Sequence, residues 1–289
     1  MGRRIAASEC TPDEVIPMPV HRLSDLHSPR LDPYRNLRTT NLTRVSGRFI
    51  AESKPLVQRL VASGLAIDSF LIDEKYLDEA IRWLPLGIDL FAVPGPFVSE
   101  LIGFAFHRGY LACGIRPDFQ RVEKGVFELT DNWLAAMLVG VQDPENMGSI
   151  FRTCAALGIT DLLIGPECVD PFARRVLRVS MGNAFKLRFF AVPDPLNALL
   201  LCGELGIESV AACLSKTSEE LSHFRRNGPG LLVLGNEAHG LPIEIQNATT
   251  RNVRIDMALG TDSLNVSVAA GIILHNLSRV CGIETDESR

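Results

Sequence analysis

The chain has 289 residues, 46% of them hydrophobic and 22% charged, a balance typical of a globular protein with one large core or two moderate ones. Its formal net charge of −5 argues against nucleic-acid binding through bulk charge, although a local basic surface remains compatible with it. No stretch approaches the roughly 20 apolar residues of a membrane span, and the N-terminus lacks the apolar segment of a signal peptide.

Residues 1–44 are rich in Pro, Arg, Asp and Ser, and their apolar residues show no period. We expect an N-terminal extension that is disordered or wrapped on a neighbour. Five arginines in and just after this stretch form a candidate basic surface, although a solvated face is the more common explanation of such a cluster taken by itself. They are Arg30, Arg35, Arg38, Arg44 and Arg48.

Residues 45–118 alternate apolar strands with helical patterns, which predicts a small α/β domain. The clearest helix covers residues 54–63, where Leu56 and Leu60 share one face and Gly64 is placed to end it. Pro94-Gly95-Pro96 reads as a turn. The other elements are strands at 67–72, 89–93 and 111–115 and helices at 78–83 and 97–106. A polar linker over 116–128 follows.

Residues 126–285 alternate in the same way, which predicts a mostly parallel sheet with helices on both faces. The run at 134–141 is continuously apolar, as expected for a strand buried on both faces. We expect further strands at 161–165, 189–192, 209–213 and 231–234, and helices at 147–157, 172–181, 197–205 and 267–280.

The seven cysteines are scattered without a C-x-x-C pair, and the six histidines show no ligand spacing. This pattern argues against disulfides and metal sites and favours a reducing cytoplasm. The glycine-rich signatures of dinucleotide and P-loop sites are absent, as are the zinc-protease and nucleophile-elbow motifs.

Three segments carry polar residues at places where an α/β sheet binds ligands. The Asp143 segment (residues 143–153, DPENMGSIFRT) follows a buried strand and opens a helix. The Gly235 loop (residues 235–241, GNEAHGL) also follows a buried strand. The Ile255 loop (residues 255–265, IDMALGTDSLN) leads into a long apolar helix. Each segment alone has an ordinary structural explanation, because Asn146 or Asn265 would serve as a helix N-cap and the glycines as a turn.

Together, in this order, the three segments resemble the SpoU/TrmH branch of the SPOUT RNA methyltransferases. That family shows D-P-x-N-x-G-x-I-x-R-T, then G-x-E-x-x-G-L, then I-P-M followed by S-L-N-V-S. The resemblance is strong over residues 126–280 and weaker over 46–118. Two positions depart from the pattern: Asp256 stands where the family has proline, and Leu259 where it has glycine, with Gly260 following.

The resemblance implies an α/β fold with a C-terminal trefoil-knotted, parallel-sheet SPOUT domain and a smaller N-terminal α/β RNA-binding domain. It implies S-adenosyl-L-methionine as cofactor, RNA as partner and a homodimer whose subunits share their active sites. Cofactor-binding residues would be Leu234, Gly235, Asn236, Gly240, Ile255, Met257, Ser263, Leu264 and Asn265. Catalytic residues would be Arg152, Asn146, Glu237 and Asn265.

The activity implied is methyl transfer to a ribose 2′-hydroxyl of structured RNA. The presence of an N-terminal α/β domain favours rRNA over tRNA as the substrate. The methylation could serve either a housekeeping role or self-protection against an antibiotic. The alternative is a non-catalytic RNA-binding or ribosome-assembly factor on the same fold. Loss of Asn146, Arg152, Glu237 or Asn265 would mark such a factor, and all four are present. We expect Arg152 to stabilise the developing alkoxide or to grip the adjacent phosphate rather than act as a base, because a guanidinium has no acceptor for a proton.

Overall fold

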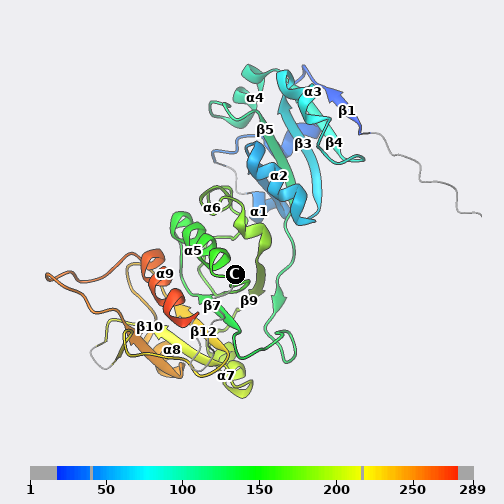
Figure 1. The fold of residues 1–289 in the computed structure, drawn as a ribbon. Helices are drawn as coiled ribbons and strands as arrows, with labels where there is room; N and C mark the ends of the chain where they lie inside the picture. Colours follow the sequence, from blue (N-terminus) through cyan, green and yellow to red (C-terminus); the bar gives the residue numbers. More distant parts are fainter. Residues whose placement is uncertain (1–17, 40–41, 216–217, 279–289) are drawn as a thin grey trace, which may run out of the picture.

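A computed structural model describes residues 18–39, 42–215 and 218–278 of the chain, which form two sheets joined at one junction (Figure 1). The N-terminal sheet is mixed, with strand order β1-β4-β3-β5-β2. Strands β1, β4 and β3 are parallel, and β5 runs antiparallel to β3 and β2. Its elements are β1 (Val20–Arg22), η1 (Pro29–Tyr34), α1 (Leu42–Ser46), β2 (Arg48–Glu52), α2 (Lys54–Ser63), β3 (Ile67–Asp73), η2 (Glu74–Tyr76), α3 (Leu77–Ala80), β4 (Asp89–Val93), α4 (Gly95–Ile102) and β5 (Tyr110–Ile115).

Residues 18–39 belong to this N-terminal domain, so the expectation of an extension up to residue 44 is wrong for them. Strand β1 pairs with β4, and Leu31 and Tyr34 are fully buried. The Tyr34 hydroxyl lies 2.9 Å from Ser69 Oγ. Leu31, Tyr34 and Leu37 recur every three residues, which is the period of a 3-10 helix and differs from those of α-helices and strands. Residues 1–17 lie outside the described part.

The Pro-Gly-Pro sequence at 94–96 is the start of helix α4 and not a free turn. Pro94 is the N-cap and Pro96 lies in the first turn, where the fixed φ of proline suits a helix and no backbone donor is needed. The helix ends at Gly103, which has a φ of 82°, rather than at residue 106.

The C-terminal sheet is parallel throughout the described residues, with strand order β11-β13-β10-β12-β7-β8-β9-β6. The predicted linker contributes its edge strand, β6. The strands are β6 (Gln120–Arg121), β7 (Leu134–Leu138), β8 (Asp161–Ile164), β9 (Arg188–Ala191), β10 (Glu208–Ala212), β11 (Glu219–Glu220), β12 (Gly230–Leu234) and β13 (Arg251–Arg254). The helices are α5 (Pro144–Ala156), α6 (Arg174–Val179), η3 (Asn183–Lys186), α7 (Pro195–Glu204), α8 (Ile243–Ala248) and α9 (Val266–Leu277).

Alternate residues of the central strands face two separate cores. On β7, Ala136 and Leu138 join the core that contains α5, α6 and α9. Ala135 and Met137 join the core beneath α7 and α8. The predicted burial of this strand on both faces is therefore confirmed, and every residue of β7 is buried.

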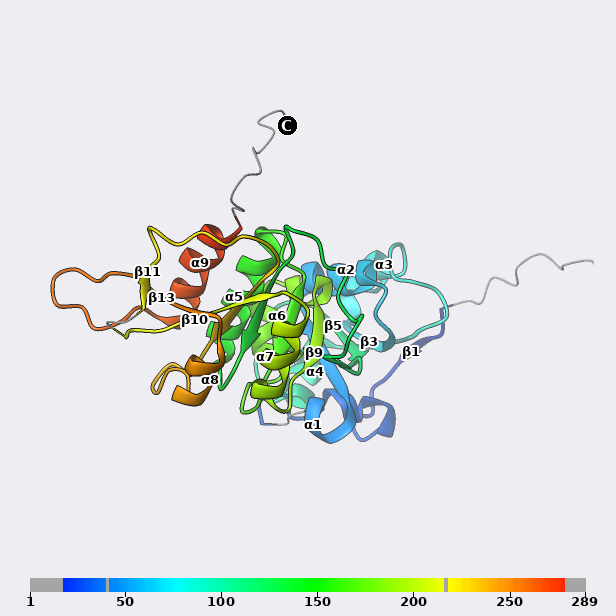
Figure 2. The same ribbon diagram turned by 90° about the horizontal axis from the view of Figure 1, so that it is seen from below.

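The two domains share one hydrophobic core at their junction. Phe49 of β2 packs against Phe172 just before α6 in a tilted arrangement, with ring centroids 4.9 Å apart. Buried Glu52 pairs with Arg174 at 3.2 Å. Because apolar packing and an ion pair both cross the junction, the domains are held in one orientation, with α6 facing the N-terminal sheet (Figures 1 and 2).

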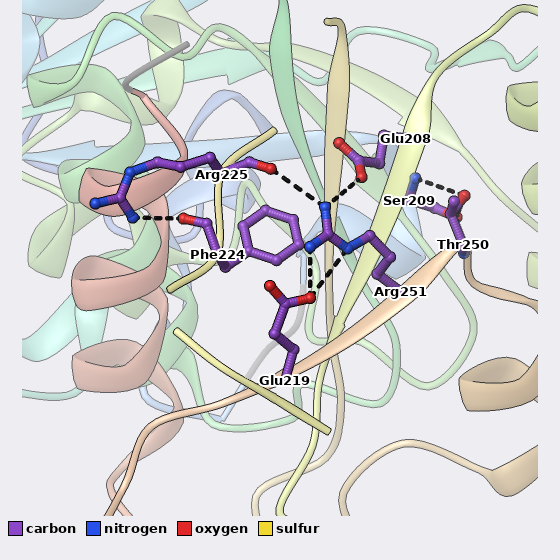
Figure 3. Close-up of polar contacts among 7 residues, drawn as sticks. All are labelled: Glu208, Ser209, Glu219, Phe224, Arg225, Thr250 and Arg251. Atoms are coloured by element: carbon purple, nitrogen blue, oxygen red, sulfur yellow. Dashed lines mark hydrogen bonds and ion pairs between the residues drawn. The ribbon is translucent and has the colours of Figure 1, made fainter. Parts of the chain in front are cut away.

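An ion cluster ties together the three strands that precede the Ile255 loop (Figure 3). Arg251, the first residue of β13, pairs with Glu219 of β11 and with Glu208 of β10. Its guanidinium also lies 4.0 Å from the centre of the Phe224 ring. These contacts fix the strand that delivers the Ile255 loop to the edge of the sheet.

A fully buried arginine anchors the other end of helix α9. The Arg226 guanidinium donates to the carbonyls of Asp131 at 3.1 Å and of Asn132 at 3.0 Å, and to the carbonyl of Leu277, the last residue of α9. Burial lowers the pKa of Arg226. Carbonyl acceptors around a buried cation offset part of its desolvation, so this contact joins the end of α9 to the loop before β7.

Candidate active site

The three polar segments meet at the carboxyl edge of the parallel sheet. The Asp143 segment follows β7, the Gly235 loop follows the adjacent β12, and the Ile255 loop follows β13. Chain order reverses at β7, since β8 lies on one side of it and β12 on the other. Ligands of open α/β sheets bind at such a switch point.

A chain of side-chain hydrogen bonds connects one residue from each segment. Asn265 Nδ2 donates to Asn146 Oδ1 at 2.8 Å, and Asn146 Nδ2 donates to Glu237 Oε1 at 3.0 Å. Asn146 is buried, whereas Glu237 and Asn265 are exposed. The structure therefore brings together three of the four predicted catalytic residues. Glu237 is exposed because the Gly235 loop reaches the surface.

Helix capping determines which of these side chains donates and which accepts. Asn265 is the N-cap of α9, and its Oδ1 accepts from the backbone of Ser267 at 2.8 Å and of Val268 at 3.4 Å. With Oδ1 engaged by the helix, Nδ2 is left to donate to Asn146. The Asn265 side chain therefore caps helix α9 and at the same time donates to Asn146 in the site.

The Gly235 loop is held by its own backbone and by Asn236. A Cβ on Gly235 would lie 2.5 Å from the backbone of Gly240, so no larger residue fits there. Asn236 Nδ2 donates to the carbonyl of Gly140 at 2.8 Å, and its Oδ1 accepts from the amide of Ala238 at 2.8 Å. The loop is thus fixed to the segment that follows β7.

A cavity of about 620 Å³ opens between these loops and helix α9. Its volume is within the range of pockets that hold small organic ligands. All the residues predicted to bind the cofactor line it, together with the three hydrogen-bonded side chains. The predicted set is Leu234, Gly235, Asn236, Gly240, Ile255, Met257, Ser263, Leu264 and Asn265.

The end of β10 supplies further lining that the sequence prediction missed, including Ala212 and Cys213. These residues reach the cavity because β10 lies beside β12 in the sheet. Only the strand order could have identified them as lining residues. The sequence of an apolar strand does not indicate which strands pair with it.

Arg152 is the predicted catalytic residue that the structure keeps apart from the others. It is exposed, makes no hydrogen bond or ion pair with the described residues and does not line this cavity. Arg152 lies six residues beyond Asn146 on α5, which corresponds to about 9 Å along the helix axis. The hydrogen-bonded residues Asn146, Glu237 and Asn265 therefore stand apart from Arg152, and the arginine that lines the cavity is Arg254.

The glycine of the Asp143 segment permits close helix packing. A Cβ on Gly148 would lie 2.7 Å from Val179 Cβ on α6. Helix α5 can therefore approach α6 only because position 148 lacks a side chain.

The two departures from the family pattern lie outside the 620 Å³ cavity. Asp256 Oδ1 accepts from Arg254 Nε at 2.8 Å. Leu259 is fully exposed and has a φ of 57°, and Gly260 follows with a φ of 71°. Leu259 therefore adopts the left-handed conformation that glycine adopts without strain.

No helix within residues 18–39, 42–215 and 218–278 is long and apolar enough to cross a membrane. The same residues hold no cluster of His, Cys, Asp and Glu able to bind a metal ion. Burial raises the pKa of the Cys154 thiol to about 12 and that of Cys168 to about 11, so neither is an activated nucleophile.

Comparisons with known proteins give a consistent result. The model of the SpoU rRNA methylase family matches residues 134–275. An uncharacterized tRNA/rRNA methyltransferase of Mycobacterium tuberculosis is 32% identical over 275 residues, covering 90% of this chain and 92% of the relative. The 23S rRNA (guanosine-2′-O-)-methyltransferase RlmB of Acinetobacter baylyi is 29% identical over 199 residues, covering 68% of this chain and 80% of the relative. The crystal structure of an rRNA methyltransferase from Sinorhizobium meliloti shares the fold, with a TM-score of 0.77 and 23% identity over 89% of this chain and 96% of that one.

Proposed function

Since the chain belongs to the SpoU family of S-adenosylmethionine-dependent RNA 2′-O-ribose methyltransferases, we propose that it methylates a ribose 2′-hydroxyl of ribosomal RNA. The observation that carries this proposal is the hydrogen-bonded trio of Asn146, Glu237 and Asn265 on the wall of the 620 Å³ cavity. The trefoil knot expected from the family is part of the same proposal.

The cavity suits the cofactor in shape and chemistry. Leu234, Ile255 and Leu264 offer apolar contact, and the bare backbone at Gly235 allows close approach. The cofactor, when bound, supplies a sulfonium methyl that is already electrophilic. The task left to the protein is to place and activate the ribose hydroxyl.

We assign that placement to the trio. Glu237 Oε2 makes no hydrogen bond with the described residues, whereas Oε1 accepts from Asn146. A carboxylate oriented in this way can accept the hydrogen bond of an incoming hydroxyl. Asn265, fixed as a helix cap, keeps Asn146 in the orientation that holds Glu237.

We further propose that Arg152 serves the active site of a second subunit in a homodimer. Helix α9 exposes Val268 (49%) and Ile272 (42%) one turn apart, beside the helix that bears Arg152. Exposed apolar residues at this spacing suit a helix-packing interface. An arginine delivered across it would stabilise the alkoxide or grip the neighbouring phosphate.

Mixing two inactive variants tests this assignment. Dimers with one Arg152→Ala subunit and one Asn146→Asp subunit keep one intact site if Arg152 acts across the interface. Random mixing should then restore about a quarter of the wild-type rate. If Arg152 acts within its own subunit, every site carries a defect and mixing restores nothing.

The preference for rRNA rests on the N-terminal domain and on the relatives reported above. The predicted basic surface there is only partly available, because Arg35 pairs with Asp32 and Arg48 with Asp68. Arg30 contacts the His21 ring, Arg38 is exposed, and the side chain of Arg44 lies outside the described part. RNA recognition then relies on shape more than on bulk charge.

The experiment offers labelled S-adenosylmethionine with unmodified ribosomal RNA and unmodified tRNA. We expect a kcat/KM for rRNA at least tenfold above that for tRNA, a difference of about 1.4 kcal/mol. Equal rates, or faster labelling of tRNA, would overturn the rRNA preference. Cofactor binding without labelling of either RNA would favour the non-catalytic RNA-binding alternative.

A further inference from the structure

The 620 Å³ cavity has one arginine and one carboxylate in its described lining, Arg254 and Glu237, and no lysine. Arg254 belongs neither to the hydrogen-bonded trio nor to the cofactor-binding residues predicted from the sequence. We propose that Arg254 binds the α-carboxylate of S-adenosylmethionine and that Asp256, which departs from the family pattern, holds Arg254 in position for it. The inference rests on the proposed function in one respect, the placement of the cofactor in this cavity.

Strand pairing fixes the position from which the Arg254 side chain starts. Arg254 is the last residue of β13 and lies opposite Glu220 of β11 in the register of the sheet. Its carbonyl accepts from the backbone amide of Leu221 at 2.9 Å. The next residue, Ile255, lines the same cavity. Arg254 is therefore presented by a paired strand, which positions a binding group more precisely than a loop does.

Two protein groups hold the guanidinium of Arg254 and leave one of its nitrogens free. Nε donates to Asp256 Oδ1 at 2.8 Å, and Nη1 donates to the carbonyl of Ser218. Nη2 makes no hydrogen bond with the described residues. Because the guanidinium is planar and its five N–H groups have fixed directions, holding two of its nitrogens also orients the third.

Asp256 contacts Arg254 from outside the cofactor cavity. Arg254 lines both the 620 Å³ cavity and a smaller one of about 370 Å³, whereas Asp256 lines only the smaller one. The carboxylate of Asp256 therefore leaves the cavity side of Arg254 to a ligand. Proline, which the family pattern has at this position, offers no side-chain acceptor for Nε. Asp256 is a positioning residue that this chain has in place of that proline.

The cofactor has one group that matches Arg254. S-adenosylmethionine carries a sulfonium, an α-ammonium and an α-carboxylate, and the carboxylate is its only anion. Arginine forms charge-assisted hydrogen bonds with a carboxylate, whereas Glu237 would repel it. An RNA phosphate is the other anion in this reaction. The cofactor carboxylate is favoured because Arg254 shares the cavity with the predicted cofactor-binding residues, Ile255 among them.

Equilibrium binding measures the carboxylate contact without turnover. Calorimetry compares S-adenosylhomocysteine with S-adenosyl-3-thiopropylamine, which is the same molecule without its carboxylate. We expect the wild type to bind S-adenosylhomocysteine about tenfold more tightly than the amine. In Arg254→Gln this preference should disappear, because the dissociation constant rises for S-adenosylhomocysteine and does not rise for the amine. Arg121→Gln, at an exposed arginine outside the cavity, should keep the preference.

Two substitutions test the positioning role of Asp256. In Asp256→Ala the guanidinium is no longer held and must be ordered on binding. The dissociation constant for S-adenosylhomocysteine should then rise about threefold, with that of the amine unchanged. Asp256→Asn keeps an oxygen that can accept from Nε and should restore wild-type binding. Equal weakening in Asp256→Asn, or tighter binding in Asp256→Ala, would overturn this role.

The outcomes distinguish this inference from the proposed function. If the wild type binds both ligands equally, or if Arg254→Gln keeps the preference, Arg254 does not bind the carboxylate and the cofactor site stands. Weaker RNA binding by Arg254→Gln with unchanged binding of S-adenosylhomocysteine would assign Arg254 to an RNA phosphate instead. Failure of the wild type to bind either ligand would overturn the cofactor site and both proposals with it.

Discussion

At the residue scale, Asn146 determines how the site is organised. Asn146 is buried, whereas Glu237 and Asn265 are exposed. It accepts a hydrogen bond from Asn265 and donates one to Glu237. A side-chain amide can do this because it carries a donor and an acceptor on one carbon. Neither a carboxylate nor a hydroxyl of similar size offers the same pair of contacts in the same geometry.

Asn146→Asp tests this role with almost no change in shape. The donor to Glu237 becomes an oxygen, so two carboxylates face each other at about 3 Å, and the contact becomes repulsive. We expect single-turnover methyl transfer to fall by about 10²-fold or more, while the folded structure persists by circular dichroism. Asn132→Asp, an exposed position outside the 620 Å³ cavity, provides the matched control. Comparable rates in the two variants would remove Asn146 from the mechanism.

Leu259 illustrates a local strain that can be measured. Leucine at a φ of 57° costs about 1 kcal/mol relative to glycine in the same conformation. We expect Leu259→Gly to leave the free energy of unfolding unchanged or slightly raised. Leu214→Gly, at another exposed leucine but with an ordinary φ, should lower it by about 1 kcal/mol. Denaturant unfolding compares them, and equal losses would refute the strain.

At the element scale, helix α5 connects the site to the rest of the fold. Its first turn carries Asn146, and its next turn packs against α6 through Gly148. Helix α6 in turn meets the N-terminal domain through Arg174 and Glu52. Packed cores adjust little. A change at the α5–α6 contact should therefore displace Asn146 as well.

Gly148→Ala tests this packing. The added Cβ would lie 2.7 Å from Val179, and we expect overpacking to lower the free energy of unfolding by about 1–3 kcal/mol. Gly203→Ala on helix α7 is the matched control, because a Cβ there meets nothing within 4 Å. That variant should be neutral or more stable by up to about 1 kcal/mol. If chemical denaturation shows Gly148→Ala to be as stable as the control, the close approach is not required.

Apolar pattern and turn chemistry predict much of this architecture. The run at 134–141 and the helix at 54–63 follow directly from residue periodicity, and the structure has β7 and α2 in those places. Elements governed by a different period or by pairing partners were missed. The 3-10 helix around Tyr34 repeats every three residues, and β6 has just two residues, which pair with β9.

The candidate site divides in a similar way. Asn146, Glu237 and Asn265 stand in motifs, and parallel strands bring such segments to one edge of the sheet. Their hydrogen-bond order, by contrast, depends on how the N-cap at Asn265 orients its amide. The position of Arg152 outside the cavity follows from its spacing of six residues from Asn146 on helix α5.

At the scale of the whole molecule, the proposed role of Arg152 involves two copies of the chain. One subunit contains the cavity and the trio, whereas its Arg152 is exposed away from them. The Ile255 loop also projects from the body on the side opposite the N-terminal domain (Figure 2). A dimer through α9 would bring the missing arginine to each site and cover the exposed apolar residues.

Ile272→Asp tests the dimer. A charge in an apolar interface is strongly unfavourable, so sedimentation should report a monomer, and methyl transfer should be lost with it. Leu200→Asp, an exposed leucine on helix α7 (66%), is the matched control and should remain dimeric and active. A fully active Ile272→Asp monomer would disprove both the interface and the shared site.

The chemical position of the methyl group tests the central claim most directly. RNA labelled from S-adenosylmethionine by the wild-type protein is hydrolysed with alkali, which requires a free 2′-hydroxyl at each cleaved linkage. Ribose methylation predicts label in alkali-resistant dinucleotides, and about 10²-fold less of it or lower when Asn146→Asp replaces the wild type. Label recovered in mononucleotides would place the methyl on a base and contradict ribose methylation by this site.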